Sequence, residues 1–288
     1  MDRGSLPLIY FFIITLVFAY FFIYGLIGWN ALLSFSRSLG LKIAFEISGF
    51  EQYLKMIHDP VFWVSIRNNL ILISVFIPAC IALGLFLAIL LDITGGRGEA
   101  FFGRLYLLPF SLSFVVTASM WAWMYNYVYG VINTILSILN LNIRVNWLGN
   151  PDIALYSIVI VLLWQFSGYA CLVILAGIKS IPESQFHAAR IDGASTFQVY
   201  SRIVLPQIKF WIFSIFVVLM VFALKAFDLI YVLTNGGPGV STYVLALLMY
   251  RRGFFETDFQ YGAALANILY VLVMAIVVPY LLITLRKR

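Results

Sequence analysis

Two ionisable side chains, Lys225 and Asp228, stand three residues apart inside the apolar run FVVLMVFALKAFDLIYVL. Charged groups in hydrocarbon are costly and typically mark a substrate or ion pathway. Their spacing predicts that both project from one helix face, with Tyr231 one turn further along. Asn267 and Tyr270 have the same spacing in a later apolar run, and these five residues form the candidate pathway. The alternative is structural: Lys225 and Asp228 neutralise each other and pack the helix bundle, and Tyr270 is a core residue.

A polar stretch, HAARIDGASTFQVYSRIVLP at residues 187–206, interrupts the apolar sequence. It predicts two short helices separated by Asp192-Gly193, because glycine permits the sharp change of direction between them. The small side chains of Ala188 and Ala189 would let another surface approach the backbone closely. The stretch therefore predicts a rigid, exposed projection, with an amphipathic helix lying on the membrane surface as the generic alternative.

The composition predicts an integral membrane protein. Of the 288 residues, 63% are hydrophobic and only 10% are charged, which is more apolar surface than a soluble domain can bury. The net charge of +6 is spread along the chain without a dense basic block, so lipid is an expected partner and nucleic acid is not. Cys80 and Cys171 lie in apolar runs and are expected to be buried free thiols.

Six apolar runs are long enough to cross a bilayer as helices, at residues 8–29, 69–91, 105–124, 153–178, 210–233 and 261–285. The expected fold is therefore an all-α membrane protein, a single domain over residues 1–288. The 30–68 connection, the longest, predicts short interfacial helices. Pro206 is expected in the first turn of the fifth span, where a missing N–H costs nothing. Trp121, Trp123 and the tyrosines up to Tyr129 predict an aromatic belt after the third span.

Basic residues in the loops predict that both termini are cytoplasmic. With this orientation the short inner loops hold more Lys and Arg than the outer ones, Arg3 lies inside, and Lys42 lies outside. The run of residues 286–288, RKR, directly follows the last predicted span. The polar stretch then lies on the cytoplasmic face. The glycine-rich segments NGGPG and GGRGEA lack the Gly-Lys-Ser/Thr ending of a P-loop, so no nucleotide site is expected on this chain.

The polar stretch resembles the EAA loop of ABC-transporter permease subunits, which reads Glu-Ala-Ala, three residues, Gly, nine residues and Ile-x-Leu-Pro. The spacing matches throughout, at His187, Ala188, Ala189, Gly193, Ile203, Leu205 and Pro206. Further segments resemble the sugar-type, maltose-like branch of this family: DPVFWVSIRNNL, ILAGIKSIPES, RIDGAS and FDLIYVLTNGGPGVST. The resemblance implies the six-helix fold of a type I ABC importer permease.

One residue departs from the family pattern, because His187 stands where the glutamate is expected. In the family that glutamate is thought to pair with a basic group of the ATPase, and an imidazole is a poor substitute for a carboxylate in such a pair. Two alternatives stay open. Glu183, one turn earlier, replaces it, or packing of Phe186, Ala188 and Ala189 carries the docking alone.

The resemblance implies an importer of a mono- or oligosaccharide in the cytoplasmic membrane. An extracytoplasmic sugar-binding protein would deliver the ligand, and a second permease subunit, usually a different chain, would complete the path. Two ATP-binding subunits would hold ATP and Mg²⁺, so no cofactor, catalytic residue or metal site is expected on this chain. Residues 179–207 would couple to the ATPase through Glu183, Phe186, His187, Ala188, Ala189, Asp192, Gly193, Ile203, Leu205 and Pro206.

Other functions stay open. Within the family, the ligand could be glycerol phosphate or another polyol derivative: Lys225 suits a phosphate, whereas Asp228 beside it favours a neutral ligand. From another class, a secondary transporter or channel could use six spans with a charged pair, although it would not explain the loop spacing. A membrane-embedded enzyme is disfavoured, because His58 and His187 fall on opposite sides of the predicted membrane.

Overall fold

The computed structural model describes residues 5–39, 42–141 and 143–285 and divides the chain into two compact units. Unit 1 comprises Met1–Trp63 and Leu248–Met274, and unit 2 comprises Val64–Leu247 and Ala275–Arg288. Of the basic residues used for the orientation, Arg3, Arg286, Lys287 and Arg288 lie outside the described residues. The expectation of a single domain and the orientation of the termini stay predictions.

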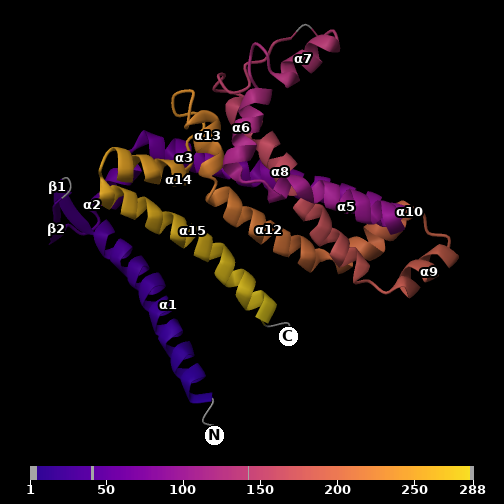
Figure 1. Cartoon of the computed structure of the whole chain (residues 1–288), viewed down its shortest axis with the longest axis horizontal. Helices are drawn as coiled ribbons and strands as arrows, with labels where there is room; N and C mark the ends of the chain where they lie inside the picture. The colour runs from indigo at the N-terminus through magenta and orange to yellow at the C-terminus, as the bar shows by residue number, and fades with distance from the viewer. Residues whose placement is uncertain (1–4, 40–41, 142, 286–288) are drawn as a thin grey trace. The chain divides into compact units, whose positions relative to one another are not determined.

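Four continuous helical segments are long and apolar enough to span a membrane. They are α1 (Ser5–Ser34), the run of α3 (Pro60–Ile71), the π-helical turn η1 (Leu72–Phe76) and α4 (Ile77–Thr94), α8 (Ala154–Lys179), and α15 (Phe259–Leu285). Two further spans are bent. They pair α5 (Gly96–Ser111) with α6 (Phe114–Met124), and α10–α11 (196–207) with α12 (Lys209–Leu224). Counting each bent pair as one span gives six, and the all-α membrane fold is confirmed (Figure 1).

Two predicted spans are wrong in detail. The run 105–124 is not one helix, because α5 ends at Ser111 and α6 leaves it at an angle of 95°. The run 210–233 is also broken: α12 ends at Leu224, and a separate helix, α13 (Asp228–Thr234), follows. Apolar composition marks a segment that can enter a membrane, but it does not show where other side chains satisfy backbone groups and allow a break.

Buried amide side chains satisfy the backbone near these breaks. Asn69 donates from Nδ2 to the carbonyl of Ala223 over 3.2 Å, at the end of α12, and accepts from the N–H of Leu245 over 2.9 Å. Gln165 donates from Nε2 to the carbonyl of Leu112 over 3.1 Å, at the bend between α5 and α6. Unpaired backbone groups in hydrocarbon cost several kcal/mol each, so both amides support broken helices inside the membrane.

The core of unit 2 is built around α8. Gly84 and Gly168 allow α4 and α5 to approach it closely, since an added Cβ would lie 2.7 Å from the Ala170 Cβ and 1.7 Å from the Tyr106 carbonyl oxygen, respectively. Phe166 of α8 packs against Phe222 of α12, with ring centroids 4.9 Å apart. Cys80 and Cys171 are free and buried in this core, as predicted.

The aromatic belt is wrong for two of its members. Trp121 and Tyr125 are buried, and Tyr125 donates its hydroxyl to the carbonyl of Ser157 over 2.9 Å. Trp123, Tyr127 and Tyr129 are exposed. Along α6 and just after it, neighbouring aromatic side chains face either the core or the surface. The order of the five rings in the sequence therefore does not show which of them are exposed.

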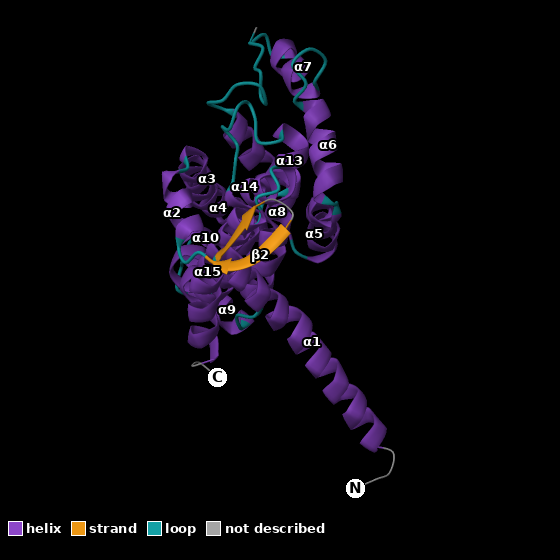
Figure 2. Cartoon of the chain, turned by 90° about the vertical axis from the view of Figure 1, so that its left-hand side faces the viewer, coloured by secondary structure: helices purple, strands orange, loops and turns teal. Residues whose placement is uncertain are grey.

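Unit 1 combines helices with a small hairpin that the sequence did not predict. Strands β1 (Ser36–Leu39) and β2 (Lys42–Ile47) pair antiparallel (Figure 2), and α2 (Glu51–His58) follows them. A short helix, α2, lies within the 30–68 connection as predicted, whereas residues 60–63 open the long α3 segment. The interfacial position of α2 stays a prediction. The remaining elements of the whole chain are short. They are α7 (Val131–Ile138), α14 (Leu245–Tyr250), the π-helical turn η3 (Arg251–Phe255) and the loop helices described below.

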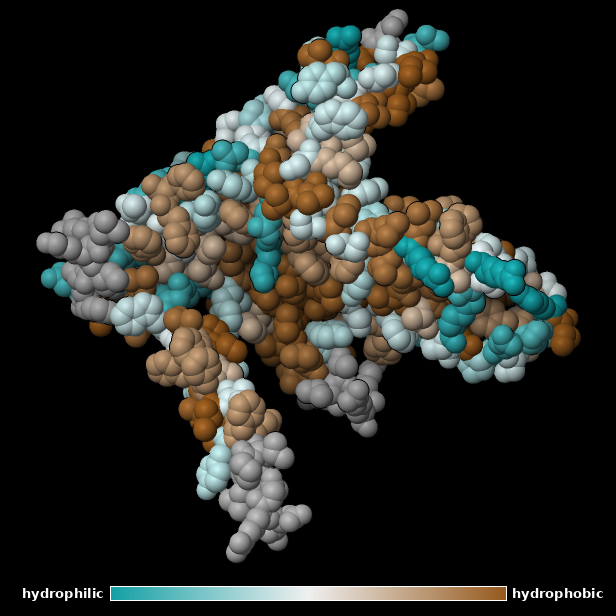
Figure 3. Space-filling model, viewed as in Figure 1, coloured by the Kyte–Doolittle hydropathy of each residue, from teal (hydrophilic) through white to brown (hydrophobic). Residues whose placement is uncertain are grey.

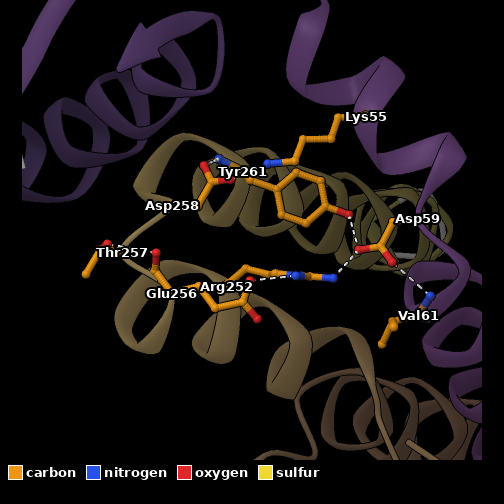
Figure 4. A network of polar contacts seen from close by, with 8 residues as sticks. All are labelled: Lys55, Asp59, Val61, Arg252, Glu256, Thr257, Asp258 and Tyr261. Carbon is orange, nitrogen blue, oxygen red and sulfur yellow. Dashed lines mark hydrogen bonds and ion pairs between the residues drawn. The ribbon is translucent and has the colours of Figure 1, made fainter. Parts of the chain in front are cut away.

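A polar network joins the parts of unit 1 (Figure 4). Asp59 accepts from Arg252 Nη2 over 2.8 Å, from the Tyr261 hydroxyl over 2.9 Å and from the N–H of Val61 over 2.9 Å. Partial burial lowers the pKa of Arg252, but the hydrogen bond to Glu256 and the charge of Asp59 outweigh it and raise the pKa overall. The guanidinium therefore stays charged, and its bond to Asp59, which also accepts from Tyr261, links η3 to the start of α3 and to α15 within this unit.

Replacing Asn69 tests the support of the broken helix. Asn69→Leu would leave the Ala223 carbonyl and the Leu245 N–H unpaired, which we expect to lower the free energy of unfolding by about 1–3 kcal/mol. Thermal unfolding in detergent measures this as a lower Tm. Asn150→Leu is the control, because this exposed amide accepts only from the N–H of Asp152 in an exposed turn, where water can replace it, and the Tm should change little. Equal Tm values for both variants would contradict the role of Asn69.

Candidate functional site

The polar stretch folds as a compact loop at one end of unit 2 (Figure 1). It comprises α9 (Glu183–Ile191), α10 (Thr196–Val199), the π-helical turn η2 (Tyr200–Val204) and α11 (Leu205–Gln207). Gly193 has φ of +76°, a conformation that glycine adopts readily, so the predicted break at Asp192-Gly193 is confirmed. Ser195 and Gln198 form a reciprocal capping box at the start of α10. The loop is thus ordered by its own hydrogen bonds.

One side of the loop packs into unit 2. Ala189 is only 7% exposed and belongs to the core, and Phe186 and Ala194 pack against that core. Ile203 and Leu205 are half-buried. Ala189 is therefore not available for close approach by another surface, contrary to the prediction, because its helix turns this methyl group inward.

The other side of the loop is exposed. The side chains of Glu183, His187, Ala188 and Asp192 lie there together with Gly193 and Pro206. Two apolar residues that the sequence did not single out, Ile191 and Phe197, are 86% and 81% exposed. Nothing in the folding of unit 2 explains why both side chains are exposed. In the sequence, the only signal for them is their position among the polar residues of the loop.

Pro206 does not open the fifth span as predicted. It lies in α11, and Ile208, with φ of −85° and ψ of 6°, separates α11 from α12 by a bend of 67°. The π-helical turn η2 runs directly into α11, so Pro206 lies within the first arm of the bent fifth span, which is also the end of the loop. Hydrophilic side chains gather at this α9–α10 end, whereas the visible face over α12 is hydrophobic (Figure 3).

A charged cluster lies beneath the loop. Asp92 accepts from the Tyr200 hydroxyl over 2.5 Å and pairs with Lys179 over 2.9 Å, and Lys179 also pairs with Glu99 over 3.0 Å. The sequence did not single out Asp92, Glu99 or Tyr200. Each stands near the end of an apolar run, which could have indicated a shared membrane boundary, but the pairing between distant segments is not visible in the sequence.

The candidate pathway residues of unit 2 lie at a helix break. Lys225 ends α12 and Asp228 begins α13, so the prediction that they share one helix face is wrong. Both side chains are exposed, and within the described chain no ion pair joins them. Tyr231 lies on α13 with its ring stacked on Phe227, at a centroid distance of 5.3 Å.

Two openings adjoin this break. Lys225 and Asp228 line a small cavity of about 20 Å³, together with Phe76, Phe114 and Phe166. Asp228 also borders a groove of about 480 Å³, which Ser113 and Gln165 line from the α5–α6 bend. The Oε1 atom of Gln165 is buried without a partner in the described chain. A groove of this size, with few polar groups among aromatic walls, has the character of a small-molecule site.

Asn267 and Tyr270 belong to unit 1. Asn267 accepts from Asn30 Nδ2 over 2.8 Å and donates to the Ser34 and Tyr53 hydroxyls over 2.8 and 3.2 Å. Both the oxygen and the nitrogen of the Asn267 amide are therefore hydrogen-bonded. These bonds form a polar cluster that holds α1 and α15 together. Tyr270 is 40% exposed, so it is not a core residue. Among the residues that the structure describes, no three His, Cys, Asp or Glu side chains gather as metal ligands.

Comparison with known proteins identifies a transport family. Residues 80–288 match the family described as "Binding-protein-dependent transport system inner membrane component". A "Probable ABC transporter permease protein" of Pyrococcus horikoshii is 51% identical over 96% of this chain and 95% of its own length. A "Xylose/arabinose import permease protein" of Haloferax volcanii is 46% identical over 90% of this chain and 82% of its own length.

A solved structure shares the fold. A chain of a bacterial alginate ABC transporter, in complex with a periplasmic protein that carries an alginate pentasaccharide, superposes with a TM-score of 0.83. The alignment covers 96% of this chain and 93% of the other, at 22% sequence identity.

Proposed function

This chain belongs to the family of binding-protein-dependent transport system inner membrane components, and we propose that it forms half of a sugar path in an ATP-driven importer. Both termini would be cytoplasmic, which puts the loop of residues 183–207 on the side where ATP is available. A second permease subunit, expected to be a different chain, would complete the path. An extracytoplasmic sugar-binding protein would load it.

The observation that carries this proposal is the exposed side of the loop. Ile191 and Phe197 are large apolar side chains held outside the core, and the exposed acidic residue Asp192 directly follows Ile191. Apolar anchors surrounded by polar groups are the usual composition of a protein-binding surface. We infer that an ATP-binding subunit docks here, and that ATP and Mg²⁺ bind to that subunit and not to this chain.

His187 and Glu183 are both exposed at the head of the loop, so either can meet the partner. Ala189 and Phe186 take no direct part, since both pack toward the membrane helices. Their role in coupling is to hold α9 against unit 2. Asp192, Gly193, Ile203, Leu205 and Pro206 would act similarly, by shaping the loop so that it moves as a body.

The substrate is proposed from the groove and from the names of relatives. The Haloferax volcanii relative is named for import of xylose and arabinose. The groove beside Asp228 offers a carboxylate, the Ser113 side chain and aromatic walls, which suit hydroxyl groups and the apolar faces of a sugar ring. Lys225 and Tyr231 would contribute from the same break. Glycerol phosphate or another polyol derivative is the second candidate, favoured by the positive charge of Lys225.

The proposal is tested by affinity purification of the chain from native membranes, followed by reconstitution. We expect an ATP-binding subunit, a second permease and a binding protein to copurify. The complex in liposomes should then take up radiolabelled xylose, arabinose, maltose or glycerol 3-phosphate only when ATP is supplied. Uptake driven by an ion gradient without ATP, or purification without an ATPase, would instead identify a secondary transporter or channel.

Docking through the exposed apolar pair predicts a specific loss of assembly. Ile191→Asp with Phe197→Asp should weaken retention of the ATP-binding subunit at least tenfold, because buried apolar anchors contribute about 2 kcal/mol or more each to a protein interface. Quantitative copurification measures this. Val128→Asp is the matched control, since Val128 is 70% exposed but lies far along the chain from the loop. Normal retention in the loop variant would exclude the pair from the interface.

The pathway proposal predicts that Lys225→Ala lowers uptake about tenfold, as expected for loss of a charged hydrogen bond to the ligand. Assembly and basal ATPase activity should stay normal, because Lys225 is exposed and makes no ion pair within the described chain. Lys209→Ala, at the opposite end of α12, is the control for loss of a basic residue. Uptake equal to that of the control would remove Lys225 from the pathway.

A further inference from the structure

Four charged or polar side chains tie the loop to the membrane helices, and we propose that Tyr200 is the positioning residue of this group for the transport cycle. The group, called the loop anchor below, consists of Asp92, Glu99, Lys179 and Tyr200. The inference rests on the proposed function, in which the loop receives the movement of the ATPase. It assigns to Tyr200 the task of passing that movement to α4.

The loop anchor connects four elements of unit 2. Asp92 lies in the last turn of α4, Glu99 in the first turn of α5, Lys179 ends α8 and Tyr200 begins η2. Asp92 is the central group, because its Oδ2 accepts from Tyr200 and its Oδ1 pairs with Lys179. Tyr200 is thus the member supplied by the loop, and the other three belong to helices that enter the membrane.

Burial distinguishes the two contacts of Asp92. The Asp92 side chain is 15% exposed and Tyr200 is 9% exposed, so the hydrogen bond between them is largely shielded from water. Lys179 is 47% exposed, and ion pairs of exposed side chains contribute little. Hydrogen bonds to an ionised acceptor are stronger than neutral ones, especially when water is excluded. The Tyr200–Asp92 bond is therefore the stronger link.

The other contacts between loop and helices are of a different kind. Ala189, Val199 and Val204 are buried in the core of unit 2 and hold the loop by apolar packing. Apolar burial is non-directional, so it stabilises the loop without fixing its register against α4. A hydrogen bond is directional. Without the hydroxyl, the loop should stay folded and bound to the ATPase but slip against α4 when pushed.

The test measures coupling in the whole complex, reconstituted with its partner subunits in liposomes. Tyr200→Phe removes only the hydroxyl. The measured quantity is ATP hydrolysed per molecule of radiolabelled sugar taken up, with the sugar that the unmodified complex imports from the panel of xylose, arabinose and maltose. We expect this ratio to rise about tenfold in Tyr200→Phe, as for loss of one charge-assisted hydrogen bond. Basal ATPase activity should be retained.

Two variants serve as controls. Ser201→Ala removes a neighbouring hydroxyl that bonds within its own helix, to the Phe197 carbonyl over 2.7 Å, and should leave the ratio unchanged. Lys179→Gln removes the ion pair but leaves the Asp92 carboxylate as the acceptor for Tyr200, so it should raise the ratio less than Tyr200→Phe does. The reverse order would make Lys179 the positioning residue and overturn the inference.

The outcomes separate this inference from the proposed function. If the unmodified complex hydrolyses ATP without importing any sugar of the panel, the proposed function fails and the inference fails with it. If import is normal but Tyr200→Phe leaves the ratio unchanged, only the inference is overturned. A proportional fall in both uptake and ATP hydrolysis would also overturn it, since that is the effect of a structural residue.

Discussion

Hydrocarbon leaves no water for backbone N–H and C=O groups, so each must find a partner within the protein. This constraint accounts for the long continuous helices and also for the few places where helices break. At the break after α12 and at the α5–α6 bend, Asn69 and Gln165 supply the missing partners. The groove beside Asp228 lies between these two irregular segments. The polar groups available to a ligand are thus found where a continuous helix would have hidden them.

The same unit carries the loop of residues 183–207. Close packing at Gly84 and Gly168 locks α4 and α5 against α8. The loop packs on this core through Ala189 and is bonded to α4 through Tyr200. Movement that the Tyr200 bond delivers to α4 is transmitted through the close-packed helices and not absorbed by them. A push on the exposed side of the loop is therefore expected to reach the helices that border the groove.

The sequence predicted the fold class, the membrane location and the two-helix loop, because these follow from apolar run length and from residue spacing. It could not predict the helix breaks, since the amides that permit them act across more than fifty positions, as Gln165 does for Leu112. Because the break between Lys225 and Asp228 cannot be seen in the sequence, their spacing wrongly predicts that both lie on one helix. Ala189 was assigned to the surface because its small side chain suits either environment. The loop anchor also depends on a distant pair, Tyr200 and Asp92, which are 108 positions apart.

The central claim is that the loop and α4 move as one body. It is tested most directly by spin labels at Ser184→Cys on α9 and Ile93→Cys on α4, both exposed positions outside the docking residues. The native Cys80 and Cys171 are buried and should not react. We predict the same distance distribution between the labels in the nucleotide-free complex and in the ATP-trapped complex that has switched conformation. A shift or broadening of that distribution on trapping ATP would show that the loop moves separately from α4 and would contradict the account.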